Sequence, residues 1–356
     1  MPSAKTKNTL LPSFEIKING SQLAVERETQ IIRVTVDEDV NLPGMFALGV
    51  NGLDDRQPTI PWLDDPQLSD LGAALEIKLG YAGELATLIK GEVIGLEPEF
   101  SRNRLPSLTV RGYDRRHRLQ RGRKTRTFIQ LKDSDIAAQI AQEAGLTAQV
   151  EDSKVTHDYM LQADQTDLAF LQERARQIQY EVMVDDRTLI FRPVANADSS
   201  VLTLTLEDDL LEFYPRLSSV GQVSEVAVRG WNFKEKEKIL GESRAGDEVS
   251  TMGGQTNAAS LVQSPFGDAV ERISDRPILT QAEADQLAKA RFNRAALALV
   301  IGEGICRGRT DLHAGAVITI DGIGIRFSGD YYVTAASHRY GPSGYYTHFT
   351  VRRNAS

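Results

Sequence analysis

The stretch LTVRGYDRRHRLQRGRKTRT, residues 108–127, separates two different kinds of sequence in this chain. It begins with a strand pattern, in which Leu108, Val110 and Tyr113 are separated by polar residues, and continues as a dense basic run. The basic run contains Arg115, Arg116, Arg118, Arg121, Arg123, Lys124 and Arg126. Because like charges repel each other, the run is expected to be solvated or to face an acidic or anionic partner. We interpret it as a hinge between a β domain and a small α+β domain.

The residues before this stretch form short segments in which apolar and polar side chains alternate, as they do in half-buried strands. These segments are residues 14–18, 31–37, 46–50, 75–80, 88–96 and 105–113. Asn19-Gly20 is typical of a hairpin turn, and the acidic triplet Asp37-Glu38-Asp39 is expected to end its strand. Many short strands joined by tight turns predict an antiparallel barrel or sandwich.

Immediately after the basic run the pattern changes to helices. Ser134 is a candidate N-cap for a first helix that ends at Gly145, and Thr166 is a candidate N-cap for a second. A short strand around residues 148–150 separates the two helices, and residues 180–192 form the pattern of a hairpin. The sequence therefore predicts a compact α+β module in the middle of the chain.

The last part of the chain returns to strand patterns, at residues 202–206, 220–231, 298–306, 316–320, 331–337 and 345–352. Residues 241–277 are rich in small and polar side chains and predict a long, partly mobile surface excursion. Thr280 and Glu283 have the spacing of a capping box, which predicts a helix behind them.

Two sequence echoes point to an internal duplication. VRGWN at residues 228–232 resembles VRGYD at residues 110–114, and residues 92–111 and 331–352 both have the pattern of a long hairpin closing in a Val-Arg pair. Two related barrels in one chain account for both echoes. Generic strand-turn patterns account for them equally well, so both explanations stay open.

These patterns predict an α+β, mainly β fold, with two antiparallel β-barrels and a small α+β insert domain between them. The expected domains are residues 1–115 (first barrel), 116–195 (two helices and a hairpin) and 196–356 (second barrel). The last domain includes the long loop 241–277 and the helix 280–297.

The composition of the chain argues against some classes of function. The chain has 356 residues and a net charge of −8, so as a whole it is not suited to coat nucleic acid. Its single cysteine, Cys306, excludes an internal disulfide and fits a reducing compartment. No export signal is recognisable at the N-terminus, and the longest apolar run, residues 295–301, is too short to span a membrane. We therefore expect synthesis in the cytoplasm and no membrane insertion by this chain.

Motifs for catalysis or metal binding are not recognisable. The five histidines show no metal-ligand spacing, and the acidic pairs Asp54-Asp55 and Asp64-Asp65 fit a solvated loop better than a calcium site. The glycines of residues 302–308 resemble a phosphate loop only superficially. Dispersed carboxylates in a glycosidase arrangement are not excluded by the sequence alone. We predict no catalytic residue, no cofactor, no metal and no small-molecule substrate.

Four segments in order resemble the phage late control D proteins and the N-terminal hub portion of VgrG proteins. They are VRGYDRRHRLQRGRKTRTF (110–128), SDIAAQIAQEAGL (134–146), QTDLAFLQERA (165–175) and DDRTLIFRP (185–193), and FSGDYYVTAASHRYGPSGYYTHFTVRR (327–353) resembles the closing hairpin of that family. The resemblance implies a structural hub in the baseplate of a contractile injection machine: a phage tail, a type VI secretion system or an extracellular tail-like particle.

In that family each subunit carries two barrels similar to the tail-tube fold, and three subunits form a ring of near-sixfold symmetry. The resemblance therefore implies a homotrimer that adapts a trimeric spike to a hexameric inner tube. The implied partners are a spike protein with an OB-fold, the inner tube protein and other baseplate proteins, with assembly in the cytoplasm. VgrG proteins continue into an OB-fold and a spike. Since this sequence stops at Ser356, we expect the spike to be a separate chain, a truncated sequence being the alternative.

Two other functions compete with the hub. The basic run 115–126, with Tyr113, His117 and Phe128 available to stack on bases, could make the chain a nucleic-acid-binding module. A tail-associated cell-wall hydrolase is the third candidate. If the chain is a hub, the basic run either complements an acidic surface of a neighbouring subunit or is a solvated connector.

Overall fold

The structure, a computed structural model, describes residues 11–51, 60, 62, 63, 65, 70–102 and 104–356. The elements up to residue 114 are β1 (Pro12–Ile18), β2 (Ser21–Gln22), α1 (Val25–Glu28), β3 (Ile31–Asp39), β4 (Met45–Asn51), β5 (Ala74–Tyr81), β6 (Glu84–Ser101) and β7 (Arg104–Asp114). The alternating segments thus form the predicted strands, and they pair antiparallel in the order β3-β4-β7-β6-β5-β1. Their apolar side chains enclose the first hydrophobic core.

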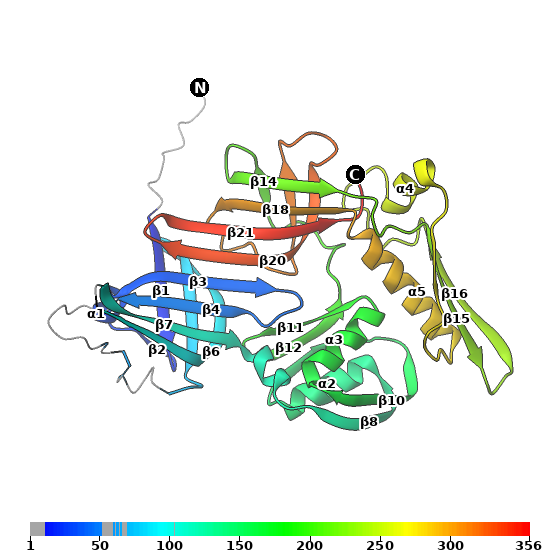
Figure 1. Cartoon of the computed structure of the whole chain (residues 1–356), viewed down its shortest axis with the longest axis horizontal. Helices are drawn as coiled ribbons and strands as arrows, with labels where there is room; N and C mark the ends of the chain where they lie inside the picture. The colour runs from blue at the N-terminus through cyan, green and yellow to red at the C-terminus, as the bar shows by residue number, and fades with distance from the viewer. Residues whose placement is uncertain (1–10, 52–59, 61, 64, 66–69, 103) are drawn as a thin grey trace.

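The middle of the chain is the predicted α+β module. Its elements are the 3-10 helix η1 (Arg115–Gln120), β8 (Lys124–Lys132), α2 (Asp133–Glu143), β9 (Thr147–Val150), β10 (Thr156–Gln165), α3 (Asp167–Gln177), β11 (Tyr180–Asp185) and β12 (Thr188–Pro193). Helices α2 and α3 lie between the β8–β10 pair and the small sheet of β11, β12 and β9 (Figure 1). Their apolar faces and those of both sheets form a separate core.

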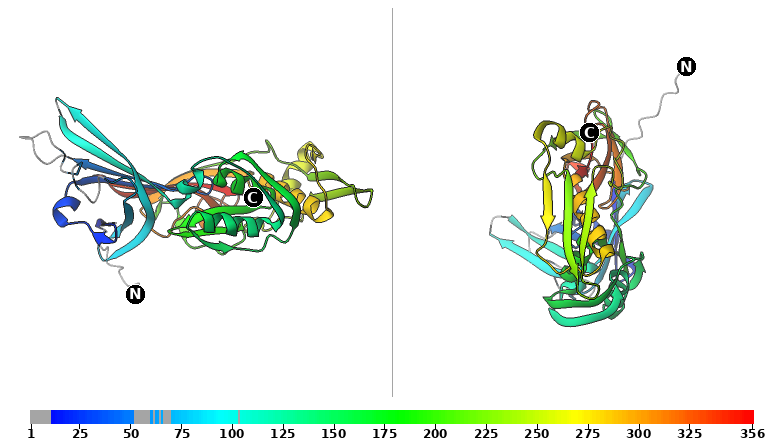
Figure 2. Two further views of the ribbon diagram at one scale, coloured as in Figure 1. Left: turned by 90° about the horizontal axis from the view of Figure 1, so that it is seen from below. Right: turned by 90° about the vertical axis from the view of Figure 1, so that its right-hand side faces the viewer.

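The last part of the chain contains β13 (Thr203–Thr205), β14 (Leu210–Leu217), β15 (Glu225–Asn232), β16 (Glu237–Arg244), α4 (Ala258–Phe266), β17 (Val270–Ile273), α5 (Gln281–Ala296), β18 (Val300–Arg307), β19 (Val317–Asp321), β20 (Gly329–Gly341) and β21 (Gly344–Arg353). Six of these strands pair in the order β14-β18-β21-β20-β19-β13. Helix α5 packs on β15 and β16 at one end of the elongated molecule (Figures 1 and 2).

The strand order is therefore the same in both halves of the large sheet. Matching β3, β4, β7, β6, β5 and β1 to β14, β18, β21, β20, β19 and β13 reproduces the order of these six strands, although β1 pairs antiparallel with β5 whereas β13 pairs parallel with β19. Two β-bulges coincide in this match: Ile31/Arg33 on β3 with Leu210/Glu212 on β14, and Val93/Gly95 on β6 with Val333/Ala335 on β20. Since bulges are specific local features of a strand pair, their coincidence fixes the equivalence residue by residue.

The two halves are one continuous sheet of 13 strands, joined where β3 pairs with β20. The predicted α+β, mainly β fold is confirmed. The expectation of two barrels is met only as two curved halves around two cores, because no strand pairing among the described residues closes either half. The expected domain boundaries at residues 115 and 195 stay a prediction.

Several local predictions are confirmed. Asn19 and Gly20 both have positive φ in the turn between β1 and β2, and Gly145 ends α2 with a φ of 70°. The hydroxyl of Thr166 accepts a hydrogen bond from the Ala169 amide, and that of Thr280 accepts one from the Glu283 amide. Each helix thus begins where its capping residue predicts.

Other local predictions are wrong. Strand β8, which includes Lys124 and Arg126 of the basic run, precedes the first helix, and α2 begins at Asp133, because the Ser134 hydroxyl contacts Ser153 instead of capping. Residues 241–277 are not one long excursion: they contain the end of β16, all of α4, and β17, which pairs with β15. The acidic triplet, by contrast, forms the last three residues of β3, so the strand ends there as expected, and β20 pairs with it through Asp39.

Of the two pairs of similar sequence segments, only one corresponds to equivalent strands in the structure. VRGWN lies in β15, which pairs with β16 and β17 outside the large sheet, so it is not the counterpart of VRGYD in β7. The paired hairpins, by contrast, are β6–β7 and β20–β21, which match in the duplicated strand order. Of the acidic pairs predicted to lie in a solvated loop, Asp54, Asp55 and Asp64 lie outside the described residues. Nearby, Trp62 is buried and donates its indole N–H to Gln30.

Candidate functional site

The contact between β3 and β20, which we call the seam, is the place where the two halves of the sheet meet. It consists of six opposed residue pairs, from Asp39–Ala335 to Val34–Tyr340. Successive side chains on a strand point to opposite faces of the sheet. Val34 and Val36 are buried on the inner face, so Thr35, Asp37 and Asp39 lie on the outer face.

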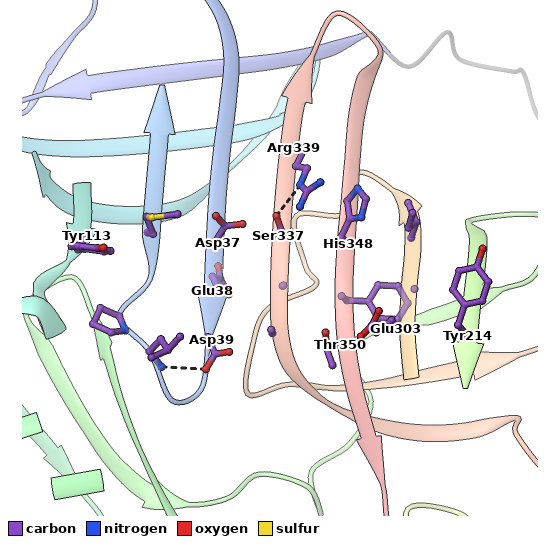
Figure 3. Close-up of a pocket in the computed structure, with 18 of the residues that line it drawn as sticks. Asp37, Glu38, Asp39, Tyr113, Tyr214, Glu303, Ser337, Arg339, His348 and Thr350 are labelled. Atoms are coloured by element: carbon purple, nitrogen blue, oxygen red, sulfur yellow. Dashed lines mark hydrogen bonds between the residues drawn. The ribbon is translucent and has the colours of Figure 1, made fainter. Parts of the chain in front are cut away.

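An open groove of about 650 Å³ crosses the outer face of the seam (Figure 3). Its floor is built from rows of side chains that stand opposite one another on adjacent strands. One row runs from Asp37 through Ser337 to His348, and the next runs from Thr350 through Glu303 to Tyr214. Because β14, β18, β20 and β21 belong to one half and β3 to the other, the groove spans both halves.

The groove carries mixed charges, with four carboxylates (Asp37, Glu38, Asp39 and Glu303) and the guanidinium of Arg339. The Arg339 Nε donates to the Ser337 hydroxyl at 3.1 Å, and the Asp39 carboxylate accepts from the amides of Asn41 and Leu42. Partial burial and the nearby Arg339 charge lower the pKa of His348, so its imidazole is neutral at neutral pH. These contacts fix the shape of the groove.

A second group of polar side chains lies on the inner face of the same seam. The Nδ1 of His313 is 2.9 Å from a Glu38 carboxylate oxygen, and the rings of His313 and His338 are 6.1 Å apart. The Nδ1 of His338 is 2.9 Å from the Tyr345 hydroxyl and 3.2 Å from that of Thr347. Burial lowers the pKa of His338 to about 4, so this ring is neutral at neutral pH.

The basic run, expected to be solvated or to face a partner, begins instead with two buried arginines that are paired within the chain. Arg115 donates to Glu92 at 3.1 Å and also to Asp186, in the turn between β11 and β12. Arg116 donates to Asp114 at 2.9 Å and to the carbonyl oxygen of Asp39. The 3-10 helix η1 therefore ties the first half of the sheet to the α+β module, which is a cross-link rather than the expected hinge.

Glu92 is the centre of this cross-link. Besides Arg115, its carboxylate contacts Arg118 at 2.6 Å and the His117 ring at 3.0 Å. Burial alone would raise the pKa of Glu92, but the hydrogen bonds and charges of these neighbours outweigh it and hold the pKa at about 2. The carboxylate is therefore ionised throughout the neutral range and compensates several positive charges at once.

The remaining cations of the run lie against the α+β module. Arg123 is 3.4 Å from Asp164, and both Lys124 and Arg126 contact Glu143 and Asp167. Arg121 is exposed and has no ion pair with any of the residues that the structure describes. The like-charge repulsion is thus relieved by carboxylates distant in sequence. A contact of the predicted residues with another subunit stays a prediction, for which Arg121 and the half-exposed Arg118 are best placed.

The sequence-based search missed Glu38, His313 and His338. Glu38 lay inside a triplet interpreted as a strand end, and the two histidines are separated by 25 positions. The one available signal was the alternation of β3 itself, which, continued past Val36, places Glu38 on the buried face.

Comparisons with known proteins give one family match, and the solved structures agree on the fold. The family model described as the Alg8 N-terminal domain matches residues 8–341. No curated protein matches the sequence. The fold is similar to the 43 kDa tail protein of prophage MuSo2 from Shewanella oneidensis, with a TM-score of 0.70, 13% identity, and coverage of 96% of this chain and 98% of that chain.

Two further solved structures have the same fold. A tail protein from Neisseria meningitidis MC58 gives a TM-score of 0.68 at 12% identity, covering 97% of each chain. The E. coli c3393 protein, described as a type VI secretion component similar to T4 tail proteins gp27 and gp5, gives 0.62 at 15% identity, covering 96% of this chain and 77% of that chain. The resemblance to tail and baseplate proteins is thereby confirmed at the level of the fold. None of the described helices is long and apolar enough to cross a membrane.

Proposed function

We propose that this chain, which belongs to the family of the Alg8 N-terminal domain, is the structural hub of the baseplate of a contractile injection machine. In this proposal three copies form a ring that adapts a trimeric spike to a hexameric inner tube. The observation that carries it is the repeated strand order within a fold shared, over nearly the whole chain, with tail proteins. Three chains with two equivalent halves each would present six similar binding positions to a hexameric tube and three to a trimeric spike.

The seam supplies a template for the contact between copies. Within the chain, β3 of the first half pairs with the second part of β20, residues 335–340. The counterparts of these two segments are β14 and residues 95–100 of β6. Among the described residues, β18 is the only strand that pairs with β14, apart from an isolated bridge between Leu206 and Leu210, and residues 95–100 pair only with β7. Each copy thus has one donor edge and one acceptor edge, which is the arrangement that closes heterologous contacts into a ring.

Because the bulges coincide, the residue pairing of the seam within a chain can be applied to the proposed contact between copies. Thr35 stands opposite Arg339 in the seam. Tyr214 is the counterpart of Thr35 and Glu99 is the counterpart of Arg339, so Tyr214 of one copy is placed opposite Glu99 of the next. One position further along, Pro215 is placed opposite Pro98. Because proline cannot donate to a ladder, the contact between copies is interrupted there and depends more on side chains.

The proposed role is non-catalytic. It is supported by the groove, whose polar contacts position backbone and side chains without activating a nucleophile. We infer assembly in the cytoplasm with a spike protein, the inner tube protein and other baseplate proteins, followed by residence in the tail or tail-like particle. The groove across the seam is a candidate seat for one of these partners.

Disulfide trapping tests the ring directly. Tyr214 is 66% exposed and the Glu99 side chain is 62% exposed, so cysteines at both positions are accessible, and Cys306 is buried. Under mild oxidation, the Tyr214→Cys/Glu99→Cys double variant is expected to give a covalent trimer on a non-reducing gel. The two single variants are controls that lack a complementary thiol and should not give that trimer.

Native mass spectrometry of the unmodified chain separates the two parts of the proposal. A trimer without disulfide trapping would refute the transferred register and keep the hub. A chain that stays monomeric, alone and when mixed with spike and tube proteins of the same machine, would refute the hub.

A further inference from the structure

The inner face of the seam carries three side chains with the donor set of a transition-metal site. Glu38 comes from β3, His338 from β20 and His313 from the loop between β18 and β19. One carboxylate oxygen and one ring nitrogen from each histidine lie within 4.8 Å of one another. We propose that these three residues bind one divalent transition-metal ion, with Zn²⁺ as the best match to two imidazoles and a carboxylate.

The orphaned nitrogen of His338 is the first argument for this site. His338 is 0% exposed, and among the described residues its Nε2 has no partner that meets the geometry of a hydrogen bond; the Leu312 backbone is a further polar neighbour of the ring. A buried polar atom without a partner is rare, and a bound ion is one of the explanations that such an atom calls for. The Nδ1 on the other side of the ring is next to the hydroxyls of Tyr345 and Thr347. Ligating histidines are typically oriented by a partner of this kind on the nitrogen that does not bind the metal.

The orientation of Glu38 is the second argument. Its Oε2 accepts a hydrogen bond from the Ala314 amide at 3.0 Å, which holds the carboxylate beside His313. Without metal, His313 Nδ1 and Glu38 contact each other at 2.9 Å, and metal binding would replace this contact by two bonds to the ion.

Access to the site is available from one side. Glu38 and His313 line a cavity of about 350 Å³ that also borders Asp114 and Arg116. The His313 side chain is 40% exposed, so an ion can reach it from solvent and a water molecule can complete the coordination. Three protein ligands with a position left for water give the four-coordinate geometry that Zn²⁺ commonly adopts.

The ion would connect the two halves of the sheet, since one ligand belongs to the first half and two belong to the second. It would be specific to the seam within a chain. At the transferred register, Leu217 and Pro98 take the places of Glu38 and His338, and neither can ligate a metal. The proposal does not depend on the hub function.

The test uses the full chain without a polyhistidine tag, stripped with a chelator. Zn²⁺ is titrated by calorimetry, and Co²⁺ serves as a spectroscopic probe of coordination. We expect one ion per chain and visible absorption bands of tetrahedral Co²⁺. Glu38→Gln and His313→Ala should each lower the affinity at least tenfold, and Zn²⁺ should raise the unfolding temperature of the wild type more than that of either of these two variants.

Two further variants complete the test. Tyr345→Phe removes a hydroxyl that orients His338, and it should weaken binding by about tenfold. His348→Ala is the matched control, because this histidine lies on β21 opposite Ser337, on the outer face of the sheet, and its replacement should leave binding unchanged. A stripped chain that binds neither Zn²⁺ nor Co²⁺ would overturn the proposal, as would affinity that survives both Glu38→Gln and His313→Ala. Circular dichroism verifies that each variant is folded.

Discussion

Replacing Glu92 with glutamine tests whether the basic segment is held by this one carboxylate. The Glu92 side chain is only 6% exposed and receives hydrogen bonds from Arg115 and Arg118 and a contact from His117. Glutamine keeps the size and one acceptor oxygen but removes the charge. The guanidinium of Arg115, 7% exposed, then keeps Asp186 as its single carboxylate partner.

The size of the effect follows from the pKa of Glu92. A pKa lowered from 4.5 to about 2 corresponds to roughly 3 kcal/mol of preferential binding to the charged form. Arg118 is 45% exposed, so solvent screening reduces its share. Breaking a fully buried pair costs about 3–5 kcal/mol, but here Arg115 retains one partner. We therefore expect Glu92→Gln to lower the free energy of unfolding by about 2 kcal/mol.

Urea denaturation followed by tryptophan fluorescence measures this loss. Trp62 is fully buried in the first core, and a Trp231→Phe background removes the signal of the other tryptophan. Glu97→Gln is the matched control on the same strand. Glu97 contacts Arg111 at 2.8 Å, but both side chains are well exposed, so the loss should be below about 0.5 kcal/mol.

The pH dependence has a defined sign. Because the pKa of Glu92 is lowered in the folded state, its contribution is fully present above pH 4.5 and is lost as the pH falls towards 2. The difference in stability between wild type and Glu92→Gln should therefore shrink across that interval. A Glu92→Gln variant that loses no more stability than Glu97→Gln at pH 7 would refute the idea that Glu92 holds the segment.

Three further predictions concern packing and the basic run. Gly112→Ala should destabilise the first half by about 3 kcal/mol, because the new Cβ would lie 1.9 Å from the Phe46 ring. In the control Gly95→Ala the new Cβ meets no atom within 4 Å, so thermal denaturation should show that this variant is tolerated. Arg116→Glu should unfold the junction with the α+β module, because its buried ion pair with Asp114 would become two facing carboxylates. Arg121→Glu should leave stability unchanged. If assembly with partner proteins also survives Arg121→Glu, this part of the run is a solvated connector. Most cations of the basic run are already paired with carboxylates, so the chain should show no salt-dependent affinity for DNA in fluorescence anisotropy at low salt. A DNA affinity that falls when Arg121, Arg123 and Lys124 become alanine would instead support the nucleic-acid-binding function.

The sequence predicts best where one face of a strand is buried. The strands of the first half were found because each alternates apolar and polar residues over an enclosed core. Strands β8 and β10 were missed for the opposite reason. Most of their side chains are exposed or half-buried, with Phe128 the one buried apolar residue of β8, so no alternation marks them. The cationic residues of β8 also belong to the basic run, which obscured its strand character.

Long-range pairing accounts for what could not be predicted. The basic run looked self-repelling because its counter-charges come from distant positions: Glu92, Glu143, Asp167 and Asp186. Likewise, Glu38 and His313 are separated by 275 positions and meet only because β3 joins β20 across the seam. Neither arrangement leaves a local spacing that a motif search can detect.

In the proposed ring, the seam within a chain should be stronger than the equivalent contact between copies, and this difference determines which contact forms first. The seam within a chain has an uninterrupted register of six pairs, with buried valines and the Glu38–His313–His338 group behind it. The equivalent contact between copies would carry opposed prolines and lack that group. Edge prolines discourage unwanted strand pairing in a free monomer. The chain should therefore fold with its own seam closed first and join its neighbours afterwards, so that subunits exchange between rings without unfolding. Mixing rings of isotopically light and heavy chains and following hybrid masses by native mass spectrometry tests this order, and exchange no faster than global unfolding would contradict it.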